Sequence, residues 1–366
     1  MLGSVTAYAQ LQAMVRALYS KMLSLRTWNS LIQATDYDGT LTILKGTVYA
    51  PYLNLDREVL TPRRTVYQIH WHLIRSYTKL IRNAPHPGSQ LLLQLWRLFE
   101  VDNLKAALRG IEVGAPWNQI RHLLVPVPSV DYVSLTLEDL ERMVRSGSVV
   151  RAVERIAHTP YYATLVHALE RYESEGHVFP LELALDLNYR RGLWESIEAL
   201  QGKDREEALR MVGTILDNDN LLWAIRFRVY HQLSSQEIIN YTLPMGYRVR
   251  DEDIRAIARG EEIRKVVARV YPELELWEVP QVQDDGSSRR WLAALELALE
   301  RYVIRLCRRT FRGAPFHIGL PIAYLQLSEH EIRDLTLLIE AKASGTPQER
   351  FRHLLELPTV LAEDSE

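Results

Sequence analysis

The sequence predicts an all-α protein made of three related helical units. Apolar residues recur at three- and four-residue steps in nearly every segment, which is the spacing of a helix with one buried face. Strand-like alternation is scarce, and its main example is "WEVPQV" at residues 277–282. One short motif also returns three times along the chain, so the helices are expected to belong to repeated units.

Four apolar stripes predict helices in order along the chain. The first runs through the N-terminal region as one stripe of Leu11, Met14, Val15, Leu18, Met22 and Leu25. Further helices are expected in "LLLQLWRLF" (91–99), "YATLVHALERY" (162–172) and "RWLAALELALERYVIRLC" (290–307). Each stretch carries polar residues between its apolar steps, which is typical of a helix packed on one side.

The repeated motif is an acidic residue followed three positions later by Asn or Asp and then by Leu. Its copies are Glu100, Asn103 and Leu104, then Asp217, Asn220 and Leu221, then Glu331, Asp334 and Leu335. We call these positions the motif acid, the motif Asx and the motif leucine. The motif leucines lie 117 and 114 residues apart. A proline follows each of them after 22 or 23 residues, at Pro126, Pro244 and Pro358.

A second pattern links the first two copies. Leu44, Thr47, Tyr49 and Leu53 match Ile156, Thr159, Tyr161 and Leu165 at a constant offset of 112 residues, with a weaker third copy near Val270 and Tyr271. Agreement of two patterns is hard to reach by chance. The sequence therefore predicts three helical repeat units at residues 1–126, 127–244 and 245–366.

Composition excludes several classes of function. Hydrophobic residues make up 47% and charged residues 25%, which is usual for a soluble globular protein, and the formal net charge is −2. No global field therefore attracts nucleic acid or an anionic membrane. The single cysteine, Cys307, excludes an intrachain disulfide and fits a reducing cytosol. We expect no signal peptide and no membrane-spanning segment, because the longest nearly uncharged apolar stretch, residues 316–327, is too short.

The stretch "ATDYDGTLTIL" at residues 34–44 resembles the nucleophile loop of a Mg²⁺-dependent phosphatase, with Asp36 and Asp38 as the paired carboxylates. That chemistry needs a buried strand before the loop and a second acidic pair for Mg²⁺. The preceding residues are helical in character, and the only similar pair, Asp284 and Asp285, lies in a polar loop. At the 112-residue offset, residues 148–151 carry no carboxylate. The favoured interpretation is that Thr35 or Asp36 caps a helix that begins near Asp38.

Other candidate sites are weaker still. His70 and His72 would point apart on a helix, and "DNDNLL" at 217–222 lacks the Gly and Glu that a calcium loop requires. Cys307 lies on an arginine-rich helix that favours its thiolate, but no catalytic partner accompanies it. The arginine pairs at 190–191, 289–290 and 308–309 are expected on solvated faces or partner contacts. We therefore predict no catalytic residue, no cofactor and no metal site, and neither a nucleic-acid partner nor a small-molecule substrate.

The third unit resembles a known family. Residues 313–347, "GAPFHIGLPIAYLQLSEHEIRDLTLLIEAKASGTP", are similar to the most characteristic segment of the C-type subunit of the V/A-type rotary ATPases, called the d-type subunit in eukaryotes. The matching positions are Pro315, Phe316, Ile318, Gly319, Tyr324, Leu325, Glu329, Glu331, Ile332, Lys342 and Gly345. The resemblance extends to "YAQLQAMVRALYSKML" near the N-terminus and to "LELALDLNYRRGLW" at 181–194, so it covers essentially the whole chain.

The resemblance implies a mechanical role. Members form a funnel of three pseudo-symmetric helical bundles on the cytoplasmic face of the membrane, peripheral to it and not inserted. The funnel receives the central shaft, made of D- and F-type subunits, and sits on the proteolipid rotor ring. Such a rotor subunit is not itself an enzyme: it transmits torque for ATP-linked proton or sodium transport, in the direction of ATP synthesis or hydrolysis. The alternatives are a helical-repeat scaffold of another complex and a phosphatase that uses Asp36 and Asp38.

The sequence departs from the family pattern at several positions. Asp334 and Glu340 stand where the family tends to have Asn and Arg, and Gly110 follows Arg109 where a second basic residue is usual. The segment "QDDGSSRR" at 283–290 resembles a local insertion. These departures bear on individual contacts, and no partner-contact residue is predicted.

Overall fold

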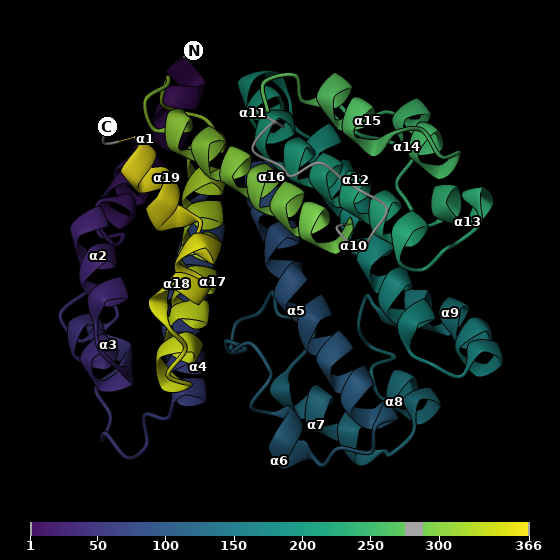
Figure 1. Ribbon diagram of the computed structural model, residues 1–366, viewed down its shortest axis with the longest axis horizontal. Coiled ribbons are helices and arrows are strands. Elements are labelled where there is room, and N and C mark those ends of the chain that lie inside the picture. Colours follow the sequence, from purple (N-terminus) through teal and green to yellow (C-terminus); the bar gives the residue numbers. More distant parts are fainter. Residues whose placement is uncertain (1, 275–287, 365–366) are drawn as a thin grey trace. The chain divides into compact units, whose positions relative to one another are not determined.

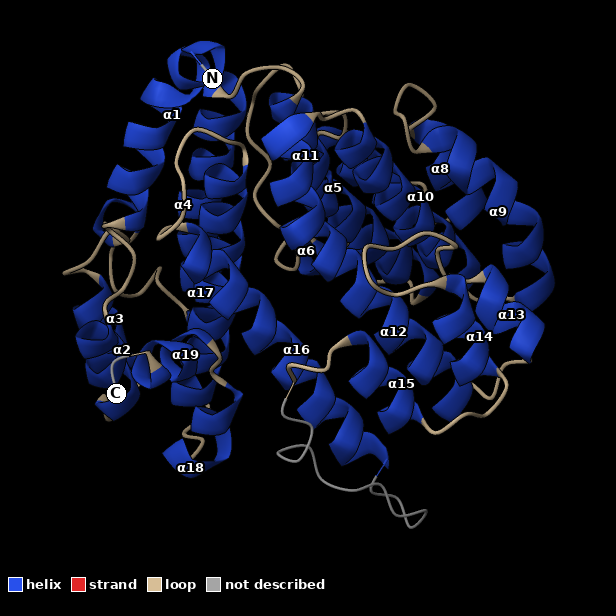
Figure 2. Cartoon of the chain, turned by 90° about the horizontal axis from the view of Figure 1, so that it is seen from above, coloured by secondary structure: helices blue, strands red, loops and turns tan. Residues whose placement is uncertain are grey.

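The fold is all-helical, as the sequence predicts. The computed structural model describes residues 2–274 and 288–364, and no strand occurs within these ranges (Figure 2). The strand candidate at 277–282 and the acidic pair Asp284 and Asp285 lie outside the described residues. None of the helices in the described part combines the length and hydropathy that a bilayer-spanning segment requires.

The chain divides into two compact units. Unit 1 comprises residues 1–48 and 197–366, so it contains both ends of the chain, and unit 2 comprises residues 49–196. These units are defined by contacts between residues, whereas the three predicted repeat units are defined by sequence similarity. The repeat boundaries at 126 and 244 therefore stay a prediction.

Unit 1 contains most of the helices, which are labelled in Figure 1. Its α-helices are α1 (Leu2–Tyr19), α2 (Leu25–Gln33), α3 (Tyr37–Leu44), α11 (Gly202–Ala208), α12 (Thr214–Val229), α13 (Ser235–Asn240), α14 (Asp251–Ala258), α15 (Ile263–Val270), α16 (Ser288–Thr310), α17 (Gly319–Ala343), α18 (Gln348–Phe351) and α19 (Leu357–Glu363). A π-helical segment (Leu209–Gly213) joins α11 to α12, and a 3₁₀ turn (Arg352–Leu354) follows α18.

Unit 2 is built around the long helices α4 and α5 and several shorter ones. It contains a 3₁₀ turn (Ala50–Tyr52), α4 (Pro62–Asn83), α5 (Gly88–Glu112), α6 (Trp117–Ile120), α7 (Leu137–Arg145), α8 (Val149–Arg155), α9 (Tyr162–Glu175) and α10 (Phe179–Glu198), whose last two residues belong to unit 1. Helix α5 packs against α4, α6, α7 and α8. Lys105 and Arg109 on α5 form ion pairs with Asp186 and Glu182 on α10.

The first helix is shorter than its apolar stripe predicts. Helix α1 ends at Tyr19, and a second helix begins at Leu25, so Met22 lies between them. The cause is Ser24, whose hydroxyl accepts a hydrogen bond from the backbone N–H of Thr27 and starts α2. A capping serine of this kind interrupts a periodic pattern that apolar spacing alone would carry through.

Helix α17 forms the centre of unit 1. It packs against α1, α3, α11, α16 and α19, and most of its side chains are buried on every side. A helix that is apolar nearly all round is expected in such a central position. In unit 2 the same role falls to α5, where Gly110 allows a close approach: a side chain there would meet Ile120 of α6 within 2.3 Å. This contact explains why a glycine replaces the second basic residue that is usual in the family.

Candidate functional site

The motif Asx residues tie each long helix to the segment that contains the following proline. Asn103 on α5 accepts a hydrogen bond from the N–H of Val125 at 2.8 Å and donates to its carbonyl at 3.0 Å. Asn220 on α12 makes the same two bonds with Leu243, at 2.9 and 3.0 Å. Val125 and Leu243 each stand directly before the motif proline. Both asparagines therefore satisfy one complete backbone unit in a buried place.

The third motif Asx, Asp334 on α17, holds the equivalent segment in a different way. A carboxylate only accepts, and Asp334 accepts from two successive N–H groups, Glu356 at 3.0 Å and Leu357 at 2.8 Å. Leu357 precedes the third motif proline, Pro358. Burial raises the pKa of Asp334 to about 6, although the two N–H donors favour its ionised form.

The motif acids bind backbone N–H groups at the entrance to a pair of short helices. Glu100 accepts from Ser134 at 2.7 Å and from Leu135 at 3.2 Å, just before α7. Asp217 accepts from Tyr247 at 2.9 Å and Arg248 at 2.6 Å, just before α14. Burial raises the pKa of Glu100, and it raises the pKa of Asp217 to about 6.

The third motif acid reaches the opposite end of the chain. Glu331 on α17 accepts from the N–H of Leu23 at 2.8 Å, directly before the cap of α2. The helix pairs whose entrances are bound by Glu331 and Glu100, α2–α3 and α7–α8, begin 112 residues apart, as the offset in the sequence predicts. The acid of the third motif copy therefore binds the entrance of the N-terminal helix pair α2–α3. The third motif copy and this helix pair both belong to unit 1.

In the second and third motif copies a basic residue stands seven positions after the motif leucine. It donates hydrogen bonds to backbone carbonyls at the C-terminus of the first helix of a pair, α14 or α2. Lys342 donates to the carbonyls of Ile32 and Ala34, at 2.7 and 2.5 Å, where α2 ends. Arg228 donates to the carbonyls of Ile257, Gly260 and Glu261, where α14 ends.

A cation suits a helix C-terminus because the last carbonyls are unpaired and carry partial negative charge. The first motif copy has Ile111 in this position, and Ser146 instead binds the carbonyl of Met143 at the end of α7.

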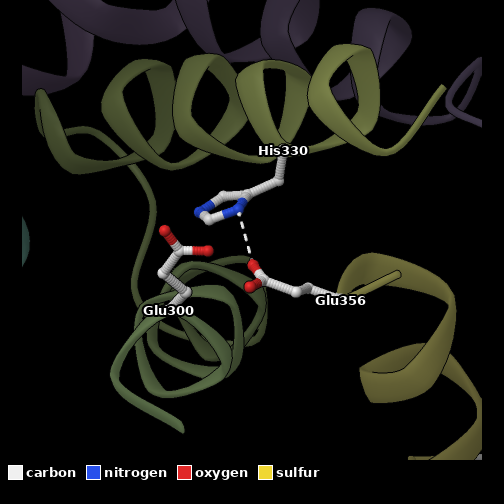
Figure 3. Close-up of side chains that lie close together, drawn as sticks. All are labelled: Glu300, His330 and Glu356. Carbon is white, nitrogen blue, oxygen red and sulfur yellow. Dashed lines mark ion pairs between the residues drawn. The ribbon is translucent and has the colours of Figure 1, made fainter. Parts of the chain in front are cut away.

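A buried polar cluster near the third motif is the strongest metal candidate in the described residues. Glu300 on α16, His330 on α17 and Glu356 before α19 offer three ligand atoms within 4.8 Å of one another (Figure 3). Arg333 already fills this centre: its guanidinium lies 2.6 Å from both carboxylates and 2.5 Å from Nδ1 of His330.

The cluster thus carries its own cation, and its chemistry follows from that. Arg333 donates to Nδ1 of His330, so this nitrogen acts as an acceptor and the ring is neutral. Burial lowers the pKa of His330 to about 3, and the charge of Arg333 acts in the same direction. Burial also raises the pKa of Glu300 to about 8, and the adjacent Glu356 carboxylate adds to the shift. Through Arg333 the group links α16, α17 and the start of α19.

The phosphatase candidate is a helix start. Asp36 is the N-cap of α3, and its side chain accepts a hydrogen bond from the N–H of Gly39 at 2.8 Å. The predicted cap is confirmed, with the helix beginning at Tyr37. Asp38 lies exposed in the first turn, where a negative charge is favourable. Ser148, the residue opposite Asp36 in the second copy, is likewise the N-cap of α8.

The remaining candidates have structural roles. His70 and His72 lie on α4, as predicted: His70 contacts the carbonyl of Val66, and His72 packs edge-on against Tyr49 and Tyr52. "DNDNLL" lies inside α12 and not in a loop.

The expectation for Cys307 was wrong. It is fully buried on α16, and burial raises the pKa of its thiol to about 12, which outweighs the opposite effect of the Arg210 charge. Of the predicted arginine pairs, 308–309 includes Arg308, which forms an ion pair with Asp364 at 2.7 Å. The side chains of residues 289–290 are not among those that the structure describes.

One carboxylate links the turn before α17 to both α1 and α11. Asp204 on α11 accepts from the N–H of Ile318 at 2.8 Å and from the hydroxyl of Tyr8 on α1 at 2.7 Å. The backbone of Phe316 is left-handed, with φ 71°. Gly319 has no room for a side chain, since a Cβ would lie 2.6 Å from the ring of His317. The Pro-Phe-x-Ile-Gly signature therefore joins α1, α11 and α17 within unit 1.

Comparison with known families identifies the chain. The family model described as ATP synthase (C/AC39) subunit matches residues 11–354. The chain belongs to this family. It is similar to the C subunit of the A-type ATP synthase of Methanocaldococcus jannaschii, with 23% identity over 97% of this chain and 88% of that protein. The C subunits of the A-type ATP synthases of Methanothermobacter thermautotrophicus (24% identity; 95% and 87% covered) and Methanobrevibacter smithii (26%; 76% and 71%) are also similar.

Membership of the ATP synthase (C/AC39) subunit family confirms the resemblance drawn from residues 313–347. The contacts made by the motif basic residue and by Asp204 were not predicted. Lys342 was quoted only as part of the family signature, although its place seven residues after the motif leucine, shared with Arg228, was a usable signal. Asp204 offered none, because its partners Tyr8 and Ile318 are 196 and 114 residues away.

Proposed function

We propose that this chain is a non-catalytic central-stalk subunit of a V/A-type ATPase or ATP synthase. In this role it is a socket that couples the central shaft to the membrane rotor ring and transmits torque for ATP-linked proton or sodium transport. The match of residues 11–354 to the ATP synthase (C/AC39) subunit family carries the proposal. The relatives of the chain are named as C subunits of A-type ATP synthases, which supports the same assembly.

The bonds of the motif residues support a mechanical role. A torque-transmitting part must resist shear between its helices. Each long helix here is linked by its motif acid and motif Asx to backbone groups in two other segments, as in Asn220 with Leu243 and Asp217 with Tyr247. Buried, geometrically defined bonds of this kind rigidify a core.

The recurrence of these bonds also supports the three repeat units at 1–126, 127–244 and 245–366. We propose that they form three pseudo-symmetric bundles around a funnel. The funnel receives the D- and F-type shaft subunits and contacts the proteolipid ring on the cytoplasmic face, without insertion into the bilayer. All three copies bind the N–H of the residue before the motif proline through the motif Asx. A socket of this kind needs broad contacts and no catalytic residue.

A pull-down from gently solubilised native membranes tests the proposal. The tagged chain is expected to bring down the shaft subunits and the ring proteins together in one complex. The matched handling control is Arg312→Met, at an exposed residue whose one ion pair within the described residues, with Asp364, is 3.8 Å long. This variant should co-purify equally. Recovery of the chain alone would overturn the proposal, and recovery with a different set of proteins would favour the scaffold alternative.

A further inference from the structure

Unit 2 contains a cavity of about 390 Å³ at the start of α4. Its walls come from three segments: residues 59–67, which lead into α4 and form its first turns, the stretch 121–125 after α6, and Leu137 at the start of α7. One wall is fixed in place by the first motif Asx, because Asn103 binds both backbone groups of Val125. The volume falls in the range of small-molecule sites.

The polar lining of the cavity is cationic. Arg63, Arg64 and Arg121 line it together with His122, and no Asp or Glu belongs to the lining. None of the three arginines forms an ion pair with a carboxylate in the described part of the chain. Some other arginines of unit 2, such as Arg142 and Arg171, are paired with neighbouring acids.

Arg64 also carries a buried donor that no group in the described residues satisfies. Its Nε is buried and has no hydrogen-bond partner, while the guanidinium lies 5.2 Å from the centre of the Tyr67 ring. A buried donor without a partner costs free energy unless a ligand or water satisfies it. The N-terminus of α4, a helix of 22 residues, adds partial positive charge beside it.

The rest of the lining is apolar. Val59, Leu124 and Leu137 contribute to it, and Val59 and Leu137 are 49% and 44% exposed. Guanidinium groups recognise phosphate through paired hydrogen bonds, and the cavity is larger than a bare phosphate needs. We propose that this cavity binds an organic phosphate, with the phosphate on Arg63, Arg64 and Arg121 and the organic part against the apolar wall and the Tyr67 ring.

Two sources share this chemistry, a soluble organic phosphate and a phospholipid headgroup, and separate experiments distinguish them. Isothermal titration of the purified full chain uses ADP and inorganic pyrophosphate as soluble probes. Flotation uses vesicles of phosphatidylglycerol, with phosphatidylcholine vesicles for comparison. Binding of ADP alone identifies a soluble ligand, and binding of phosphatidylglycerol vesicles alone identifies a headgroup. Each of these results supports the proposal.

Matched variants separate the cavity from general charge. Arg63→Gln/Arg121→Gln removes two exposed charges from the lining, and Arg151→Gln/Arg155→Gln removes two exposed charges from α8 in the same unit. The cavity variant should bind about tenfold more weakly or worse, and the α8 variant should stay within about twofold of the parent. Equal thermal unfolding midpoints of the two variants exclude a folding effect.

Three results would overturn the proposal. The first is no binding of any probe at about 1 mM. The second is an equal loss of affinity in the two double variants, which would mean a diffuse surface charge. The third is equal affinity for pyrophosphate and ADP, which would remove the role of the apolar wall. The site is independent of the rotor role, since a chain that fails these tests still co-purifies with a rotary complex if that role holds.

Discussion

The same connection is made by an amide in unit 2 and by a carboxylate in the C-terminal part of unit 1. Asn103 binds both the N–H and the carbonyl of Val125, whereas Asp334 accepts from the N–H groups of Glu356 and Leu357. The amide is neutral at every pH at which the protein folds. The carboxylate is buried, and its pKa is raised to about 6.

In all three motif copies the motif Asx accepts a hydrogen bond from the N–H of the residue before the motif proline, but the second backbone partner and the charge of the acceptor differ. In unit 1 the carboxylate stands next to further ionisable groups: Arg333 follows Glu331 and Ile332 on α17 and bonds Glu300 and Glu356. In unit 2 the corresponding bond of Asn103 involves no charge. We therefore expect pH to affect the third connection and to leave the first unchanged.

The largest effect is expected from Arg333→Met, which removes the cation from the cluster in unit 1. Glu356 is buried and Glu300 half-buried, so their carboxylates would lose the charge that compensates them. The free energy of unfolding should fall by about 3 kcal/mol at pH 8. The loss should be clearly smaller at pH 5, because both carboxyl groups can then take up a proton. Urea unfolding followed by circular dichroism measures both values.

The control for this variant is Arg312→Met, at a side chain that is 71% exposed. An exposed ion pair contributes little, so its effect should stay below about 1 kcal/mol at either pH. If Arg333→Met had equal effects at pH 5 and pH 8, the cluster would act by packing alone, and the contrast with unit 2 would lose its basis.

A smaller loss is expected when the amide connection is broken by Asn103→Ala. The N–H and the carbonyl of Val125 would both lose their partner, and we expect a loss of about 2 kcal/mol, equal at pH 5 and pH 8. Asn220→Ala should act similarly through Leu243. Asn118→Ala, at an exposed position on α6, is the control and should change little. A strong pH dependence in Asn103→Ala would contradict the assignment of a charge-free bond.

Asp334→Asn replaces the carboxylate of the third motif Asx by the amide that the other two copies, Asn103 and Asn220, already have. The folded pKa of Asp334 is raised from 3.8 to about 6, so its protonated form stabilises the fold below pH 3.8. That stability is lost as the pH rises through 6. The variant should therefore be about 1 kcal/mol more stable than the parent at pH 8. Its stability should also fall less between pH 4 and pH 7.

This measurement is a comparison of two unfolding curves against pH. Glu300 and Asp217, whose pKa values are also raised, remain in the variant, so part of the fall persists. A variant that is less stable than its parent at pH 8 would mean that the two accepted N–H bonds outweigh the burial of the charge.

The sequence predicted the helices and the recurrence of the motif, because both depend on the spacing of residues along the chain. The apolar steps identified the helices, and the 112-residue offset placed Asp36 opposite Ser148, both of which are helix caps. The break at Ser24 was missed, since a cap replaces the next periodic residue without disturbing the stripe. The burial of Cys307 was missed because arginines nearby in the sequence do not reveal which face of the helix carries the cysteine.

Long-range contacts could not be predicted in the same way. Glu331 bonds Leu23 across 308 residues, and the motif gave no sign that its third copy serves the N-terminal helices. The cluster of Glu300, His330 and Glu356 was likewise hidden, because its members come from three separate elements. A single sequence carries spacing along the chain, whereas such clusters depend on how helices pack.

The smallest contrast between copies concerns the helix caps, and Asp36→Asn tests it. Asp36 bonds the N–H of Gly39, whereas Ser148 caps α8 without a side-chain bond, so the first copy relies more on its cap. Asn caps a helix about as well as Asp, and the free energy of unfolding should change by less than about 0.5 kcal/mol, against about 1 kcal/mol for Asp36→Ala. Neither the parent nor Asp36→Asn should hydrolyse p-nitrophenyl phosphate with Mg²⁺. Turnover that is present in the parent and lost in Asp36→Asn would restore the phosphatase alternative, since a cap contributes to folding and not to catalysis.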